Sequence, residues 1–455
     1  MLRKSIFGIM VFLLLIGMWT LAFKIQPANA GTINVPDDYS TIQAAIDAAS
    51  LGDTVFVRTG TYVENVVVNK NVSLVGENVA TTIIDGGGSG TVVNITANGV
   101  QVTSFTIRNS GPKGWVNAGI RLEGASYCSI YGNNITANTG YGIWLSYSSD
   151  YNNIYGNNIT ANDLDGIYLS FSRQNNIYEN EIKNNRYGVG LSSSSNYNSI
   201  SGNIMTGNGR GFFVSSSNYN NISGNTITNS VDGIRLEGSS SNSINRNNIT
   251  ANDLDGIGLY IYSDANSIYE NEIKNNSYGI RLSSSNNVYK NTITNSECGI
   301  SIGGSSNNVY ENTITNSVDG IRLEGPNNRI YGNDVLANTG YGIYLSFSHQ
   351  NNIYHNNFAN NTNQVYLHNS FENVWDDGYP SGGNYWSDYN GTDHNGDGIG
   401  DTPYTIDNNN QDRYPLVNRW VIPEFPVSVM FAGLLTLITT FLICAKKTAR
   451  KHMAR

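Results

Sequence analysis

The amino-acid sequence predicts an all-β fold, a right-handed parallel β-helix, which is a solenoid with about 22 residues in each coil. Three observations predict it. A glycine followed by an apolar residue returns every 20 to 24 residues from Gly119 to Gly342. Apolar residues alternate in short segments after each glycine, which indicates strands rather than helices. Asn, Ser, Gly and Asp fill the breaks, where they supply turns.

The repeat unit explains why the coils stack. One unit, residues 166–182, reads GIYLSFSRQNNIYENEI. A single unit cannot bury its apolar side chains alone, whereas neighbouring units can bury them together and pair every strand. Asparagine recurs at equivalent places in successive units, which predicts ladders of side-chain hydrogen bonds along the axis. The Asn- and Ser-rich connections argue against a leucine-rich repeat, and we assign residues 76–370 to the solenoid.

The first residues of the chain have the pattern of a signal peptide. Arg3 and Lys4 precede an apolar run from Ile6 to Phe23, and Ala28-Asn29-Ala30 provides a cleavage site. We predict a signal peptide over residues 1–30, with an uncleaved anchor as the alternative. Both interpretations predict export.

Residues 31–75 are predicted to form an N-terminal cap and the first strands. The segment 41–49 has the apolar spacing of a short amphipathic helix, and it is followed by Gly52-Asp53-Thr54-Val55 and Gly60-Thr61-Tyr62. The open end of a solenoid exposes unpaired strands, so we expect the helix to cover it.

The C-terminal region has the pattern of a membrane anchor. Val427 to Ala445 contains no charged residue, and five Lys and Arg residues follow before the terminus. We predict a transmembrane helix and sorting segment over 423–445 and a basic cytoplasmic tail over 446–455. Residues 371–422 then form a separate C-terminal module.

These residues together resemble a known family. The predicted helix with Gly-Asp-Thr-Val and Gly-Thr-Tyr, followed by Gly-Ile-x-Leu and Asn-x-Ile coils, resembles the NosD-like and pectate-lyase-like β-helix superfamily over residues 31 to about 370. The segment from Gly383 to Tyr404 is similar to a module that closes many archaeal surface proteins, and Pro423-Glu424-Phe425-Pro426 resembles an archaeal sorting signal. The resemblance implies the fold. It does not imply one activity, because members include lyases, hydrolases, epimerases, copper-site accessory proteins and surface proteins.

A loop in the C-terminal module predicts a structural Ca²⁺ site. Oxygen ligands fall at positions 1, 3, 5, 7 and 9 of an EF-hand-like loop, with Gly398 at position 6. Position 12 is Tyr404 rather than Glu, and an acidic Gly-rich turn is the alternative. The predicted ligands are Asp393, Asn395, Asp397, the carbonyl of Ile399, and Asp401.

Outward positions of the strand that follows each repeat glycine predict a carbohydrate-binding stripe. Aromatic rings beside Arg and Glu suit saccharides, although ordinary cross-strand stacking explains the same pattern. The candidates are Trp144, Tyr168, Phe213, Arg235, Glu237, Tyr260, Arg281, Arg322 and Tyr344.

Catalytic and copper-binding candidates are weaker. Asp232 and Asp255 precede a glycine in adjacent coils, where two carboxylates could serve acid–base hydrolysis, but Asp-Gly is also a common turn dipeptide. The copper chemistry that the resemblance raises would fall to His349, His355 and His368.

The charge balance completes the functional hypothesis. The chain has a net charge of −9, and residues 31–425 hold 18 of the 26 Lys and Arg but all 35 Asp and Glu. An acidic ectodomain argues against nucleic acid as a partner. We predict a membrane-anchored cell-surface protein, without catalysis, that binds polysaccharide or forms part of the cell envelope. A polysaccharide lyase or hydrolase is one alternative, and a NosD-like copper accessory protein is another.

Overall fold

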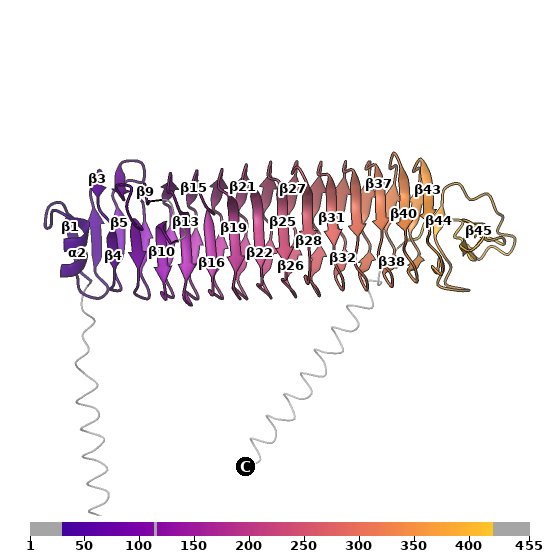
Figure 1. Ribbon diagram of the computed structural model, residues 1–455, viewed down its shortest axis with the longest axis horizontal. Coiled ribbons are helices and arrows are strands. Elements are labelled where there is room, and N and C mark those ends of the chain that lie inside the picture. The colour runs from indigo at the N-terminus through magenta and orange to yellow at the C-terminus, as the bar shows by residue number, and fades with distance from the viewer. Residues whose placement is uncertain (1–29, 113–115, 422–455) are drawn as a thin grey trace, which may run out of the picture. The chain divides into compact units, whose positions relative to one another are not determined.

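The computed structural model describes residues 30–112 and 116–421 (Figure 1). These residues fall into two compact units that divide between Ser263 and Asp264. Each unit is a parallel β-solenoid in which every coil adds one short strand to each of three sheets, called sheets A, B and C. The predicted signal peptide, membrane segment and basic tail lie outside the described residues, except for Ala30.

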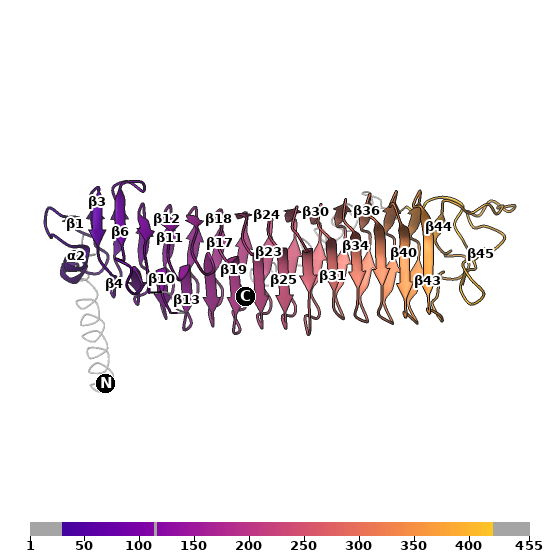
Figure 2. The same cartoon turned by 45° about the horizontal axis from the view of Figure 1, so that its top comes forward.

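Unit 1 contains the first strands of all three sheets. In Figure 2 the sheet B strands β12, β18 and β24 follow one another in one row, and the sheet C strands β13, β19 and β25 in another. Sheet A contains β1 (Thr32–Val35), β2 (Thr54–Val57), β5 (Ser73–Gly76), β8 (Gln101–Thr103), β11 (Ser129–Tyr131), β14 (Asn153–Tyr155), β17 (Asn176–Tyr178), β20 (Ser199–Ser201), β23 (Asn221–Ser223) and β26 (Ser243–Asn245). Sheet B contains β3 (Gly60–Val63), β6 (Thr82–Asp85), β9 (Thr106–Arg108), β12 (Asn134–Thr136), β15 (Asn158–Thr160), β18 (Glu181–Lys183), β21 (Ile204–Thr206), β24 (Thr226–Thr228) and β27 (Asn248–Thr250). Sheet C contains β4 (Val66–Val68), β7 (Val93–Ile95), β10 (Ala118–Glu123), β13 (Tyr141–Ser146), β16 (Ile167–Ser170), β19 (Tyr187–Ser192), β22 (Arg210–Ser215), β25 (Asp232–Glu237) and β28 (Asp255–Leu259).

Unit 2 repeats this arrangement. Its sheet A strands are β29 (Ser267–Tyr269), β32 (Asn287–Tyr289), β35 (Asn308–Tyr310), β38 (Arg329–Tyr331) and β41 (Asn352–Tyr354). Its sheet B strands are β30 (Glu272–Lys274), β33 (Thr292–Thr294), β36 (Thr313–Thr315), β39 (Asp334–Leu336), β42 (Asn357–Ala359) and β44 (Tyr385–Trp386). Its sheet C strands are β31 (Tyr278–Leu282), β34 (Cys298–Ile302), β37 (Asp319–Leu323), β40 (Tyr341–Ser346) and β43 (Asn363–His368). An antiparallel pair, β45 (Tyr404–Thr405) and β46 (Gln411–Asp412), completes the unit.

The helix expected near the N-terminus is α2 (Ile42–Ala48). Thr41 caps it, since its hydroxyl accepts a hydrogen bond from the backbone N–H of Ala44. The helix buries Ile42, Ala45 and Ile46 and contacts β1, β2 and β4, at the start of the solenoid (Figure 1). Its role as a cap stays a prediction. Across residues 30–112 and 116–421, no helix is long and apolar enough to cross a membrane.

Strict register produces the core. Ile154 of β14 pairs with Ile177 of β17, and Ile159 of β15 pairs with Ile182 of β18, so the same kind of side chain points inward in every coil. These isoleucines are fully buried, and the residues on either side of them in each strand point outward. Because side chains alternate across a strand, a shift of one residue would expose the whole apolar set.

Buried asparagines form ladders at the corners between the sheets, as the sequence predicted. The Asn157 amide Nδ2 donates to Asn180 Oδ1 at 3.0 Å, and Asn180 Nδ2 donates to Asn203 Oδ1 at 2.9 Å. The same Oδ1 atoms accept the backbone N–H of the preceding coil's asparagine, at 3.1 and 3.0 Å. Unit 2 has an equivalent ladder at this corner. It contains Asn271, Asn291, Asn312, Asn333, Asn356 and Asn384.

A left-handed residue precedes each asparagine of this ladder from Asn157 to Asn356 and turns the chain from sheet A into sheet B. In unit 1 it is often glycine, as at Gly202 and Gly224, whose φ angles are 64° and 63°. Other coils place a charged residue there, such as Lys290 and Glu311, both with a φ of 56°. Left-handed backbone disfavours most side chains, so the asparagine hydrogen bonds must hold this corner in place.

The C-terminal module packs against the last coil of unit 2. Strand β44 extends sheet B by pairing with β42, and this pairing stacks Trp386 on Phe358 with 4.8 Å between the ring centroids. Asp412 is buried, and its carboxylate accepts hydrogen bonds from the backbone of Asn384 at 2.7 Å and from Trp386 Nε1 at 2.9 Å. Burial raises the pKa of Asp412 to about 7.

We expect Asn180→Ala to lower the free energy of unfolding by roughly 2–4 kcal/mol, because it leaves the backbone N–H of Asn157 and other buried groups without partners. Asn176→Ala is the matched control. Asn176 is exposed, and its side-chain amide donates one hydrogen bond, to Asn153 Oδ1. We therefore expect a loss of unfolding free energy below about 0.5 kcal/mol. Urea denaturation measures both, and equal losses would contradict the structural role of the ladder.

Candidate functional site

Most of the stripe predicted from sequence forms an outward column on sheet C, but Glu237 and Tyr260 each lie two residues beyond the column positions Arg235 and Gly258. In unit 1, parallel register aligns Arg121 with Trp144, Trp144 with Tyr168, and Phe213 with Arg235. Gly190 separates Tyr168 from Phe213 in the same column. In unit 2, Arg322 aligns with Tyr344, and Tyr344 with Tyr366. Adjacent coils therefore present these side chains one strand spacing apart.

Arginines of this column lie on aromatic rings. The guanidinium of Arg121 lies 4.4 Å from the Trp144 ring centroid, and that of Arg235 lies 3.9 Å from the Tyr260 centroid. In unit 2, Arg281 lies 3.9 Å from the Tyr278 centroid. Cation–π contact and cross-strand stacking thus hold the column together.

The predicted stripe residues are all half-buried, with part of each side chain left at the surface. Tyr168 stacks on Tyr141 at 4.6 Å, and Arg235 forms an ion pair with Glu237 at 2.7 Å. We call these residues the arginine–aromatic face of sheet C, described separately for each unit. Its members are Trp144, Tyr168, Phe213, Arg235, Glu237 and Tyr260 in unit 1, and Arg281, Arg322 and Tyr344 in unit 2.

The two candidate catalytic acids are neighbours beneath this face. The backbone N–H of Asp255 donates to Asp232 Oδ1 at 3.4 Å. Asp232 also accepts from Arg210 Nε at 2.9 Å, and Asp255 accepts from the Tyr260 hydroxyl at 2.5 Å. Both acids are fully buried, so neither carboxylate contacts solvent from which a substrate would approach. This geometry stabilises the face and does not form an open acid pair.

Asp165 and Asp319 occupy the equivalent place in other coils. Burial raises the pKa of Asp165 to about 6, although Arg186 Nε lies 2.9 Å from its carboxylate and opposes the shift. Asp319 pairs with Arg322 at 2.7 Å. A buried acid paired with a half-buried arginine therefore recurs beneath the face in both units.

The predicted calcium loop is folded around its own backbone. Asp393 accepts hydrogen bonds from the N–H groups of Gly396 and Gly398, at 2.7 and 2.9 Å, and Asp397 accepts from Ile399 at 2.9 Å. The bond from Ile399 lowers the pKa of Asp397. Asp401, the last predicted ligand, bonds to His394 Nδ1 at 2.5 Å.

The residues available do not fit a copper site. His349 packs on Phe371, His355 on Trp420 and His368 on Phe347, each with a different aromatic partner. Among residues 30–112 and 116–421, no three His, Cys, Asp or Glu side chains are arranged to hold a metal ion.

The two cysteines among the described residues add nothing to such a site. Cys128 lies in unit 1 and Cys298 in unit 2, and both are buried thiols without a disulfide. Burial raises the pKa of Cys128 and raises that of Cys298 to about 12, which disfavours the thiolate that a metal requires.

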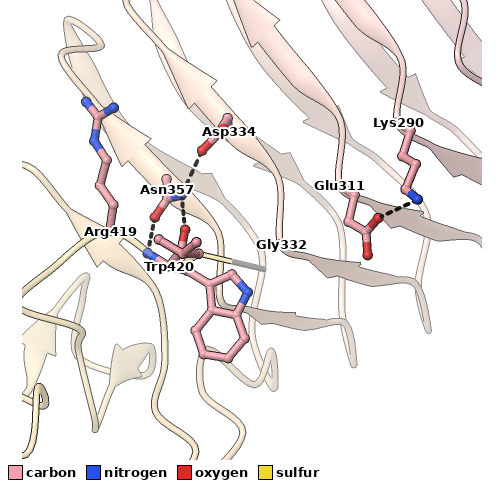
Figure 3. Close-up of a pocket in the computed structure, with 8 residues that line it drawn as sticks. Lys290, Glu311, Gly332, Asp334, Asn357, Arg419 and Trp420 are labelled. Atoms are coloured by element: carbon pink, nitrogen blue, oxygen red, sulfur yellow. Dashed lines mark hydrogen bonds and ion pairs between the residues drawn. The ribbon is translucent and has the colours of Figure 1, made fainter. Parts of the chain in front are cut away.

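A pocket in unit 2 was missed by sequence reasoning. It has a volume of about 580 Å³ and lies where the segment 419–421 crosses the corner between sheets A and B (Figure 3). The repeat pattern does not predict this pocket, because the hydrogen bonds that fix the segment join residues 63 positions apart. Its lining residues are Lys290, Glu311, Gly332, Asp334, Asn357, Arg419, Trp420 and Val421.

Comparisons with solved structures return carbohydrate-active proteins at low identity. The A-module of the Azotobacter vinelandii mannuronan C-5 epimerase AlgE4 is 18% identical, with a TM-score of 0.44, over 74% of this chain and 95% of that chain. A DFA-IIIase from Arthrobacter chlorophenolicus in complex with GF2 is 13% identical, with a TM-score of 0.45, over 72% of this chain and 94% of that chain. At these identities the likeness concerns the fold and not the activity.

Sequence comparison identifies the family. A probable ABC transporter binding protein NosD from Pseudomonas aeruginosa is 41% identical over 108 residues, which span 20% of this chain and only 24% of that relative. The family model described as periplasmic copper-binding protein (NosD) matches residues 46–213, 165–285 and 260–391. Because these overlapping matches cover most of the chain, the protein belongs to the NosD family of β-helix repeat proteins.

Proposed function

We propose that this protein is a non-catalytic member of its family that binds polysaccharide along the arginine–aromatic face of sheet C. The observation that carries the proposal is the aligned, half-buried column of rings and guanidinium groups in each unit. Aromatic rings pack against the apolar faces of sugars, and guanidinium and carboxylate groups hydrogen-bond their hydroxyls.

The repetition of the column favours a polymer as ligand. Adjacent coils of a parallel sheet lie about 4.8 Å apart, so a chain that follows the solenoid axis meets a new side chain at most coils, with gaps at Gly190 and Gly258. Several weak contacts made by one polymer add up to an avidity that a single sugar does not reach. A neutral or cationic glycan suits an acidic ectodomain best.

Burial of the acids supports binding over catalysis. A general acid or nucleophile must reach the scissile bond, and Asp232 and Asp255 are fully covered in this arrangement. Copper delivery finds no support in the described residues, because no three of their His, Cys, Asp or Glu side chains are arranged to hold a metal ion.

Export and attachment complete the proposal. The family description names periplasmic proteins, in agreement with the signal-peptide pattern of residues 1–30. We propose that residues 423–445 anchor the chain in the membrane, with the tail 446–455 in the cytoplasm. We also propose that the loop 393–401 binds Ca²⁺ and stiffens the C-terminal module, because its backbone N–H groups orient Asp393 and Asp397. The acids of the described loop are not gathered around one metal position, so Ca²⁺ would have to draw them together.

The double variant Trp144→Ala/Tyr168→Ala should weaken polysaccharide binding at least about tenfold, equivalent to about 1.4 kcal/mol, because it removes two adjacent stacking surfaces. A glycan array identifies the ligand, and affinity electrophoresis compares the variants. Tyr155→Ala/Tyr178→Ala is the matched control, since these rings also stack, at 4.9 Å, but lie on sheet A. A wild-type protein that binds no glycan would overturn the proposal, and so would equal weakening by both pairs.

Asp232→Asn should lower the free energy of unfolding by about 2 kcal/mol, because it leaves Arg210 without its anionic partner. This is less than the roughly 3–5 kcal/mol lost when a fully buried ion pair is broken, because Arg210 is only partly buried. Glycan affinity should change little in protein that remains folded. If the wild type cleaves polysaccharide and Asp232→Asn abolishes this cleavage, the result would favour the lyase or hydrolase alternative instead.

Calcium should raise the midpoint of thermal unfolding. A site occupied at one hundred times its dissociation constant adds about 2.7 kcal/mol. We expect Asp393→Ala to lose this Ca²⁺-dependent shift and Asp253→Ala, an exposed acid in unit 1, to keep it. Scanning calorimetry with CaCl₂ or EDTA measures the unfolding midpoint of each protein. An unchanged midpoint of the wild type on addition of Ca²⁺ would contradict the proposed Ca²⁺ site.

A further inference from the structure

The pocket of unit 2 exists because one side chain is absent from the corner between sheets A and B. The left-handed position that precedes each ladder asparagine holds Lys290, Glu311, Gly332 and His355 in four successive coils. Gly332 lacks a side chain, and a Cβ atom added there would meet no atom closer than 3.8 Å. The space that Lys290 and Glu311 fill in their own coils is therefore open beside Gly332.

The segment 419–421 closes one side of this space. Asn357 is buried and holds both backbone polar groups of Trp420, as its Oδ1 accepts the Trp420 N–H at 2.7 Å and its Nδ2 donates to the carbonyl at 2.9 Å. The Trp420 ring stacks on His355 with centroids 3.7 Å apart and planes 3° apart. The indole is thus held in a fixed orientation at the pocket wall (Figure 3).

Charged groups of both signs line the pocket together with the indole. Lys290 Nζ lies 3.7 Å from a carboxylate oxygen of Glu311, and Asp334 accepts a hydrogen bond from Asn357 Nδ2 at 2.7 Å. Arg419 is exposed at the rim. Two cations and two acids balance in charge, so the pocket selects neither anions nor cations but offers several strong hydrogen-bonding groups.

We infer that this pocket binds a single neutral sugar residue. A fixed indole provides an apolar surface for a pyranose ring, and charged donors and acceptors around it match the hydroxyl groups. Its volume falls within the range of small-molecule pockets. The site lies at the corner between sheets A and B, apart from the arginine–aromatic face of sheet C. The inference therefore does not depend on polysaccharide binding at that face.

The inference is tested by filling the space beside Gly332 with a side chain. Gly332→Lys places in the pocket the side chain that Lys290 carries at the equivalent position, where the backbone has a similar φ angle, 66° against 56°. Gly224→Lys is the matched control, because Gly224 occupies the same corner in unit 1, has a φ of 63° and has open space around it. The full-length protein is titrated with the methyl glycosides of glucose, mannose and galactose, and binding is followed by saturation-transfer NMR.

We expect the wild type and Gly224→Lys to bind at least one glycoside with the same affinity, and Gly332→Lys to bind it at least about tenfold more weakly. Trp420→Ala gives a second route should Gly332→Lys not fold, and it should weaken binding to a similar extent. The inference is overturned when no glycoside binds the wild type, or when binding survives both pocket variants. Loss of polysaccharide binding in Trp144→Ala/Tyr168→Ala leaves this result unaffected.

Discussion

The buried asparagine ladder is the interaction on which the rest of the structure depends. A coil of about 22 residues must turn three times, and each turn leaves backbone groups inside the solenoid that no strand can pair. An asparagine supplies both a donor and an acceptor, so Asn180 bonds the coil before it and the coil after it at once. The ladder also tolerates charged residues in left-handed conformation beside it, and these residues then become available at the surface.

The functional surfaces follow from this constraint. Because the corners hold the backbone in strict register, outward side chains of successive coils lie directly above one another. Stacking therefore stabilises the arginine–aromatic face and would also orient it for the proposed ligand. The same register makes the pocket, since one glycine among larger corner residues leaves a gap of defined size. Under the proposed function, stability and recognition would use the same residues, so each variant is compared with a control that removes a similar structural contact.

Membership of the NosD family fixes the architecture more firmly than the chemistry. The family description names copper, yet in the described part of this chain no three His, Cys, Asp or Glu side chains are arranged to hold a metal ion, and its two thiols are buried. A solenoid can lose a site on its surface without loss of fold, because each coil is stabilised by its neighbours rather than by a ligand. Surface residues of such a fold change function coil by coil.

The sequence by itself determined the repeat, the strands, the inward isoleucines and the asparagine ladders, because a periodic pattern fixes contacts between residues one coil apart. It also placed Trp144 and Tyr168 in one column for the same reason. Only the tertiary structure decided that Asp232 is buried under arginines and that Asp401 turns to His394, since burial depends on which side chains lean across neighbouring coils. The pocket at Gly332 could be found only in the tertiary structure, because Trp420 contacts Asn357 outside the repeat pattern.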